Sequence, residues 1–122
     1  MPKILIVEDD QSLVKVLVKK LTQEGFEVST AANGKIGLAT AIKNKPDLIL
    51  LDIVMPVMDG LTMLQELRKD RWGKLARVIL LTNLSDSEKV SEALQHGIYV
   101  YLVKADWKLE DVVKKVKETL GL

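Results

Sequence analysis

The sequence predicts an α/β fold in which five parallel strands form a doubly wound sheet, (βα)5. Short apolar runs alternate along the chain with stretches whose apolar residues recur at helical spacing, and each kind occurs five times. One run, residues 48–51, is apolar at every position, which is typical of a strand buried on both faces. This alternation without repeats or linkers is typical of a parallel sheet, which binds ligands at the carboxyl ends of its strands.

The first half of the chain contains three of the predicted strands. Residues 3–7 form the first, and residues 26–30, which alternate in polarity, form a second strand near an edge of the sheet. Gly25 ends the helix between them, and Pro46 ends the next helix before the buried third strand. The apolar residues expected to face inward are Leu13, Val14, Leu17, Val18 and Leu21 on the first helix, and Ile36, Leu38, Ala41 and Ile42 on the second, which follows Asn33-Gly34.

The second half repeats the pattern. Asp59 is a plausible N-cap for a third helix that contains Leu61, Leu64 and Leu67, and residues 77–82 form a fourth strand. Ser85 and Glu88 have the capping-box spacing and begin a helix that ends near Gly97. Residues 99–103 form the fifth strand. The inner stripe of the last helix is Leu109, Val112, Val113, Val116 and Leu120, and Glu110 and Asp111 lie in its first turn, where the helix dipole favours anions.

Composition limits the classes of function. The 122 residues, expected to form a single domain over 1–122, are 48% hydrophobic and 29% charged, which is ordinary for a folded soluble protein. The net charge of +1 gives no global electrostatic reason to bind nucleic acid or a membrane. There is no cysteine, which excludes disulfides and thiolate metal sites. No signal peptide is visible, and no apolar run approaches the roughly 18 residues of a membrane span, so we expect a cytoplasmic protein.

Charged and polar residues follow the predicted strands at one edge of the sheet. They are Glu8 and Asp9 after the first strand, Asp52 after the third, Thr82 at the end of the fourth and Lys104 after the fifth. Clustered carboxylates repel, so such a group either has a raised pKa or binds a divalent cation. Carboxylates without histidine or cysteine suit magnesium. A lysine and a hydroxyl are the groups that phosphoryl transfer needs, and Asp52 would be the nucleophile.

Simpler interpretations apply to several residues. Alone, Thr82 is an ordinary strand threonine and Lys104 a solvated lysine, and it is their coincidence with the acids at one edge that favours a site. Asp10 is expected to cap the first helix. Asp47 lies at the opposite end of its strand, and His96 at a helix end is expected to be solvated, so neither is assigned to the site.

Taken in order, these residues resemble the receiver domain of two-component response regulators of the chemotaxis-regulator type, over essentially the whole chain. The resemblance implies a flavodoxin-like fold. It also makes Asp52 the phosphoacceptor, Thr82 the switch hydroxyl and Lys104 the lysine of the family's site. It implies Mg²⁺ bound by Asp9, Asp52 and the backbone carbonyl of Val54, with Glu8 acting through water. The loop MPVMDG then follows the phosphoacceptor, and Tyr101 is the aromatic residue that rotates inward.

The resemblance also implies partners. A histidine kinase or histidine phosphotransfer protein would donate the phosphoryl group to Asp52. Phosphorylation would then change the surface of the fourth helix, fifth strand and last helix, which contacts a downstream protein or a fused output domain. Such a domain catalyses only its own phosphorylation and dephosphorylation and is not otherwise an enzyme. We expect no output module within these residues, no direct contact with nucleic acid and no association with a membrane.

The chain departs from the family pattern at a few positions. Ala105 follows Lys104 where the family usually has proline, and because a cis bond before a non-proline residue costs about 3 kcal/mol, the sequence predicts a trans bond. Trp107 then lies partly exposed as a partner anchor or packs against the loop. Asn83 replaces a small residue and narrows access to Asp52. Val54 and Leu84 cannot orient an attacking water, which predicts slow loss of the phosphoryl group.

Other classes of protein stay open as alternatives. A phosphatase of the haloacid-dehalogenase type also uses a strand-end aspartate with magnesium, but its second acid would fall on Val54. A nucleotide-binding fold needs a glycine-rich first turn, and the residues here are VEDDQS. The remaining alternative is a pseudo-receiver, an interaction module that is never phosphorylated.

Overall fold

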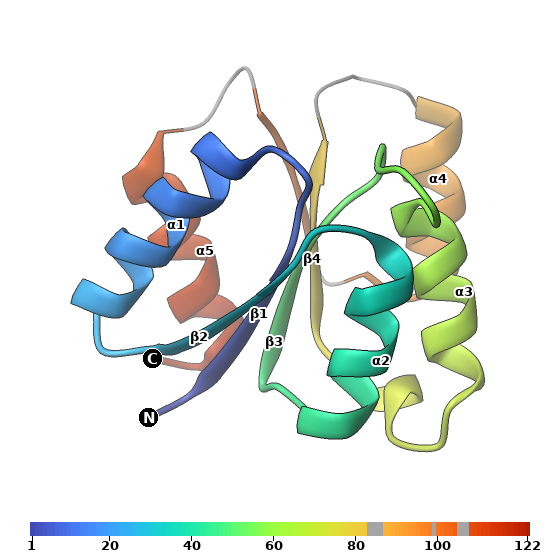
Figure 1. The fold of residues 1–122 in the computed structure, drawn as a ribbon, viewed down its shortest axis with the longest axis horizontal. Helices are drawn as coiled ribbons and strands as arrows, with labels where there is room; N and C mark the ends of the chain where they lie inside the picture. The colour runs from blue at the N-terminus through green and yellow to red at the C-terminus, as the bar shows by residue number, and fades with distance from the viewer. Residues whose placement is uncertain (83–86, 99, 105–107) are drawn as a thin grey trace.

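Five parallel strands form one sheet in the order β2-β1-β3-β4-β5 (Figure 1). The computed structural model describes residues 1–82, 87–98, 100–104 and 108–122. The predicted class of fold is confirmed. The elements are β1 (Lys3–Val7), α1 (Gln11–Gln23), β2 (Glu27–Ala31), α2 (Gly34–Asn44), β3 (Leu48–Asp52), α3 (Gly60–Lys69), a 3₁₀ turn η1 (Gly73–Leu75), β4 (Val78–Thr82), α4 (Ser87–Gln95), β5 (Val100–Val103) and α5 (Leu109–Leu120).

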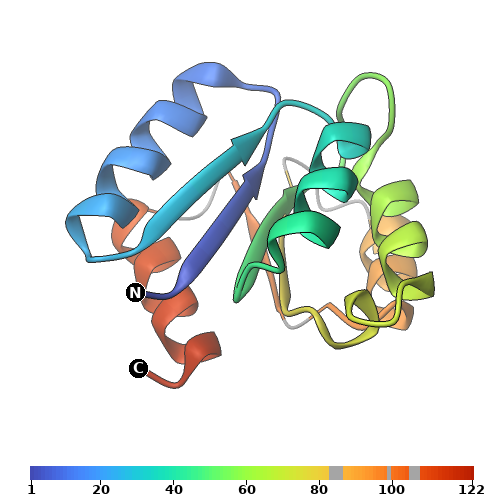
Figure 2. The same cartoon turned by 60° about the horizontal axis from the view of Figure 1, so that its bottom comes forward.

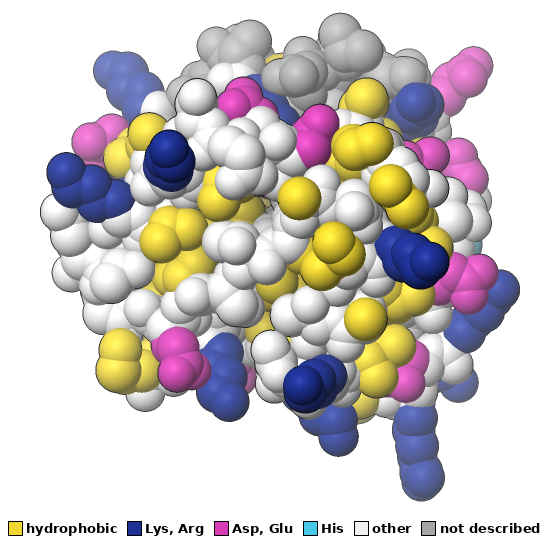
Figure 3. All heavy atoms as spheres, in the orientation of Figure 1, with side chains coloured by type: hydrophobic (Ala, Val, Ile, Leu, Met, Phe, Trp, Pro, Cys, Tyr) yellow, Lys and Arg dark blue, Asp and Glu magenta, His cyan; other side chains and the backbone are white. Residues whose placement is uncertain are grey.

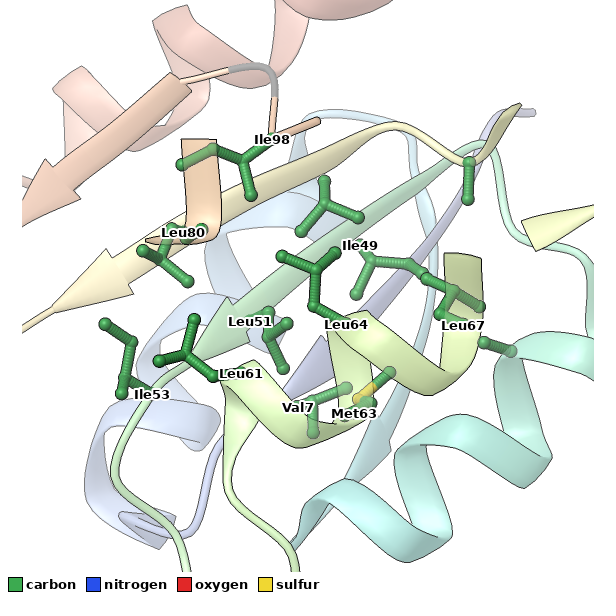
Figure 4. Close-up of a cluster of buried hydrophobic side chains, with 14 of the residues drawn as sticks. Val7, Ile49, Leu51, Ile53, Leu61, Met63, Leu64, Leu67, Leu80 and Ile98 are labelled. Carbon is green, nitrogen blue, oxygen red and sulfur yellow. The ribbon is translucent and has the colours of Figure 1, made fainter. Parts of the chain in front are cut away.

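The helices cover both faces of the sheet. Helices α1 and α5 lie on one face and α2, α3 and α4 on the other (Figure 1). Figure 2 shows the same layers with the bottom of the molecule turned toward the viewer. Each face has its own apolar core. In the core under α2, α3 and α4, Leu51 and Leu80 of the sheet pack with Leu61 and Leu64 of α3 (Figure 4). Every residue of β3 is buried, as predicted for the central strand.

Side-chain caps fix where three helices begin. Asp10 accepts hydrogen bonds from the backbone N–H groups of Ser12 and Leu13, Asn33 accepts one from Ile36, and Asp59 accepts one from Thr62. Each bond satisfies a donor that the first helical turn leaves without a partner. The predicted caps at Asp10 and Asp59 are confirmed, and Asp10 therefore has a structural role at the start of α1.

The inward face of α2 differs from the prediction. Ile36 and Ile42 were expected to face the core, but their side chains are 50% and 38% exposed. The buried residues are Gly34, Gly37 and Ala41 instead. A Cβ atom on Gly37 would lie 2.8 Å from a methyl group of Val7, so α2 packs against the sheet through small residues, and its larger residues point away.

Element boundaries shift by one residue in two strands, with β2 at Glu27–Ala31 and β4 beginning at Val78. The predicted position of β2 at an edge is confirmed. Several predictions concern residues outside the described ranges. They are the predictions for Asn83, Leu84, the Ser85 capping box, Tyr99 in the fifth strand, Trp107 and the peptide bond between Lys104 and Ala105. In the part of the chain that is described, no helix is long and apolar enough to cross a membrane.

Candidate functional site

The five predicted site residues lie at the carboxyl edge of the sheet. Asp52 is the last residue of β3 and Thr82 the last of β4, while Glu8 and Asp9 follow β1 and Lys104 follows β5. Residues at the ends of neighbouring parallel strands meet because the strands share one direction and register. Glu8, Asp52 and Thr82 are buried, with 1%, 4% and 3% of their surfaces exposed. Acidic side chains are visible along this upper edge of the molecule in Figure 3.

Lys104 forms ion pairs with both buried carboxylates. Its Nζ atom lies 3.3 Å from Oδ2 of Asp52 and also donates a hydrogen bond to Oε1 of Glu8. The lysine side chain is 11% exposed. Desolvation acts to lower the pKa of Lys104, but the bond to Glu8 and the charges of Asp52 and Glu8 outweigh it and raise the pKa above its usual value. The ammonium group therefore compensates two buried charges that would otherwise be costly.

Backbone hydrogen bonds fix the same side chains. The N–H of Ile53 donates to Oδ1 of Asp52 at 2.8 Å, and the N–H of Asp10 donates to Oε2 of Glu8 at 3.2 Å. The N–H of Lys104 donates to the carbonyl oxygen of Thr82 at 2.6 Å, which continues the pairing of β5 with β4 past the last strand residue. Each carboxylate thus has one oxygen bound to backbone and the other beside the lysine.

Glu8, Asp9 and Asp52 form a cluster of carboxylates that can bind a metal ion. Each offers an oxygen within 4.8 Å of the others. Desolvation at this cluster, then hydrogen bonding to Glu8 and repulsion from its charge, raise the pKa of Asp9, although Asp9 is exposed. Carboxylate oxygens at this spacing suit a small hard cation such as Mg²⁺, which retains water in its other positions. The donor set therefore fits the predicted metal.

The remaining predicted residues are placed as follows. Val54 lies in the loop after Asp52, with 62% of its surface exposed, and Tyr101 lies on β5 with 43% exposed. Asp47 accepts a hydrogen bond from the N–H of Lys3 at 2.7 Å, at the opposite edge of the sheet, which confirms its structural role. His96 is half-buried at the end of α4 and is not part of the acidic cluster.

Gly60, the first residue of α3, supports the site in a way that the sequence analysis missed. Its N–H donates to the carbonyl oxygen of Ile53 at 2.7 Å, and a Cβ atom on it would lie 2.0 Å from the carbonyl oxygen of Asp52. Only glycine allows α3 to approach the end of β3 this closely. The sequence signal was the Asp-Gly pair at the end of MPVMDG, which predicts a cap but not a contact with Asp52.

A doubly wound parallel sheet with a buried aspartate, an acidic cluster and a lysine at its carboxyl edge is the arrangement of a signalling receiver domain. The chain belongs to this family, because the model of the response regulator receiver domain matches residues 4–117. Membership makes it a component of the two-component signalling class.

Similar proteins include multidomain regulators. The chain is 40% identical over 102 residues to the response regulator PleD of Caulobacter vibrioides. These 102 residues are 84% of this chain and 22% of that protein. It is 33% identical over 120 residues to the DNA-binding dual master transcriptional regulator RpaA of Synechocystis, covering 98% of this chain and 49% of that protein. The chain therefore spans about half the length or less of these relatives.

Solved structures agree with the fold. A CheY-like receiver domain protein from Methanospirillum hungatei superposes with a TM-score of 0.92 at 31% identity and covers 99% of this chain and 94% of that one. The response regulator TrrA from Thermotoga maritima, solved in complex with Mg²⁺ and BeF, gives a TM-score of 0.86 at 34% identity, covering 98% and 100%.

Proposed function

We propose that the 122 residues form a single receiver domain in which Asp52 accepts a phosphoryl group from the phosphohistidine of a histidine kinase or a histidine phosphotransfer protein. The observation that supports this most directly is the position of Asp52. It is buried at the end of the central strand, 3.3 Å from the Lys104 ammonium group and within a cluster of three carboxylates. A buried, charge-compensated aspartate at a ligand-binding edge is typical of a reactive carboxylate.

The transfer is a displacement at phosphorus. An oxygen of the Asp52 carboxylate attacks the phosphorus atom, the new P–O bond forms as the P–N bond to the histidine breaks, and the imidazole leaves with the bonding electron pair. Asp9, Asp52 and the Val54 carbonyl would hold a magnesium ion, with Glu8 acting through water, and the ion would supply positive charge to the phosphoryl oxygens. Lys104 neutralises a further phosphoryl oxygen, and the Thr82 hydroxyl donates a hydrogen bond to another.

The same proposal includes a response of the surface. Thr82 is the last residue of β4 and Tyr101 lies on the neighbouring β5, whose register pairs Thr82 with Val103. Movement of the Thr82 hydroxyl toward the phosphoryl group would allow the half-exposed Tyr101 ring to turn inward and change the face formed by α4, β5 and α5. That face would contact the downstream protein or output domain, and a cytoplasmic location follows from the kinase partner.

Phosphorylation of the purified chain tests the proposal. With acetyl phosphate and Mg²⁺, we expect mass spectrometry to find one phosphoryl group on Asp52, and we expect none in Asp52→Asn or after chelation with EDTA. The matched control is Asp47→Asn, which changes the acid at the other end of the same strand. It should be phosphorylated normally.

The same experiment separates the alternatives. A phosphatase would release phosphate over many turnovers, and a pseudo-receiver would stay unmodified. The exposed Val54 side chain stands where a phosphatase of the haloacid-dehalogenase type would need its general acid. An unmodified Asp52 in the folded wild-type protein would overturn the proposal.

A further inference from the structure

The loop between β3 and α3 contacts the first residue of a different helix, α2. The N–H of Gly34 donates a hydrogen bond to the carbonyl oxygen of Met58 at 2.9 Å. Asn33, the residue before it, caps the helix by accepting a hydrogen bond from Ile36. The loop bound in this way, residues 53–59, begins directly after Asp52 and contains Val54.

The contact leaves no room for a side chain on Gly34. A Cβ atom there would lie 2.5 Å from the carbonyl oxygen of Met58 and 3.0 Å from that of Asp59. Both obstacles are backbone atoms, which cannot turn aside as a flexible side chain could. Gly34 does not have a positive φ, unlike Gly25, so its backbone conformation is one that other residues adopt. Close approach to the loop is what requires glycine at this position.

Hydrogen bonds at other points restrain the rest of the loop. The N–H of Gly60, at the start of α3, donates to the carbonyl oxygen of Ile53 at 2.7 Å and so joins the two ends of the loop. Within the loop, the N–H of Met58 donates to the carbonyl oxygen of Pro56 at 2.8 Å. The hydrogen bond from Gly34 adds a restraint from a different helix. The position of the segment after Asp52 therefore depends on where α2 begins.

We propose that Gly34 is a positioning residue for the metal-binding end of this loop. By allowing the close approach of Met58, Gly34 fixes the loop that follows Asp52 and contains Val54, two of the residues that would hold Mg²⁺. The inference rests on the proposed function, since it assigns α2 a part in the same site. Residues that orient metal ligands without contacting the ion commonly affect metal affinity as well as stability.

Magnesium affinity tests the inference. In Gly34→Ala the added methyl group pushes the loop outward, and we expect the Mg²⁺ dissociation constant, measured by calorimetry, to rise roughly tenfold. Phosphorylation of Asp52 by acetyl phosphate should need correspondingly more Mg²⁺ and approach the wild-type rate at saturation. This separation of metal affinity from maximal rate is a result that a general loss of stability would not produce.

The matched control is Gly37→Ala, in the same helix. Gly37 is also buried, and its Cβ would meet the side chains of Val7 and Met63 at 2.8 Å and 3.0 Å, away from the loop. This variant should lose stability and keep the wild-type Mg²⁺ dissociation constant. If its affinity falls as much as that of Gly34→Ala, the inference is overturned.

A second variant covers the case in which Gly34→Ala does not fold. Asn33→Ala removes the cap of α2 and loosens its first turn without adding an atom at the contact. Its Mg²⁺ dissociation constant should also rise, by a smaller factor than in Gly34→Ala. If the Mg²⁺ dissociation constant is unchanged in Asn33→Ala and in folded Gly34→Ala, the inference is overturned. The proposed function would still hold in that case, provided that the wild-type protein is phosphorylated. A wild-type protein that neither binds Mg²⁺ nor becomes phosphorylated would overturn the proposed function itself.

Discussion

Lys104, near the end of the chain, lies 3.3 Å from the Asp52 carboxylate and also pairs with Glu8, near its beginning. The lysine follows β5, an edge strand of the sheet, whereas Glu8 follows β1, and β3 and β4 lie between these two strands. The side chain thus spans the carboxyl edge and compensates both buried acids. Its charge is part of the fold as well as of the site.

Lys104→Met is expected to destabilise the metal-free protein. Removing one partner leaves Glu8 and Asp52 as buried charges without compensation, which costs about 3 kcal/mol in the free energy of unfolding. Urea titration in EDTA measures the loss, and added Mg²⁺ should recover part of it. The control is Lys117→Met, which breaks a pair with Glu24 that is much more exposed than that of Lys104 and should have a much smaller effect. Equal losses in the two variants would contradict the prediction.

Gly60→Ala is expected to disturb Asp52 directly. The new methyl group would overlap the carbonyl oxygen of Asp52, so we expect a loss of about 2 kcal/mol in stability and at least a tenfold slower phosphorylation by acetyl phosphate. Gly73→Ala is the matched control, because its Cβ would lie just as close, 2.0 Å, to the carbonyl oxygen of Leu67 near the end of α3. That variant should lose stability but be phosphorylated at the wild-type rate once folded.

Much of the fold and of the site could be predicted because both depend on local pattern and strand direction. The apolar run before Asp52 predicts a central strand, and parallel strands necessarily bring their carboxyl ends to one edge. The inward face of α2 could not be predicted in this way. Ile36 and Ile42 have the apolar character of core residues, and only the distance between the helix and Val7 shows that Gly37 faces the sheet.

The contact of Gly34 with Met58 and the pairing of Lys104 with Glu8 also escaped prediction, for a different reason. An Asn-Gly pair indicates a turn or cap but not which loop approaches it. A lysine after a strand indicates a charge at the sheet edge, but its pairing with Glu8 depends on the reach of the side chain across the sheet. Such long-range contacts leave no periodic signal in the sequence.

Val57→Asn is expected to stabilise the protein. Val57 has a φ of 70°, at the centre of a three-residue turn closed by the Met58–Pro56 hydrogen bond, and this conformation is strained for a β-branched residue. Asparagine tolerates it, and because the side chain is 77% exposed, little burial is lost. We expect a gain of about 1 kcal/mol in urea unfolding.

Val16→Asn serves as the control for this gain. Val16 is also exposed, at 49%, but lies in the regular helix α1. The substitution there relieves no strain and should not stabilise the protein. A destabilised Val57→Asn variant would indicate that the valine side chain makes favourable contacts on the loop.

Val54→Glu is expected to shorten the lifetime of the phosphorylated state. The Val54 side chain is exposed beside the site, where a carboxylate could accept a proton from the water that attacks the phosphoryl group. We expect decay to accelerate about tenfold or more, measured after removal of acetyl phosphate. Val57→Asn, on the same loop, should leave the decay rate unchanged, and a wild-type rate in Val54→Glu would argue against the mechanism.

Arg68→Lys is expected to loosen the edge of the domain opposite the site. The guanidinium group donates hydrogen bonds of 2.6–2.8 Å to four carbonyl oxygens, those of Gly73 and Ala76 before β4 and of His96 and Gly97 after α4. A lysine cannot reproduce this planar arrangement, and part-buried carbonyls that lose their donor are costly, so we expect a loss of about 3 kcal/mol in the free energy of unfolding. Phosphorylation of Asp52 should persist in the folded variant, because none of these bonds touches the carboxyl edge. Hydrogen exchange should instead show faster opening between α4 and β5. If Arg68→Lys is as unstable as Arg68→Ala, the lysine retains none of the four contacts.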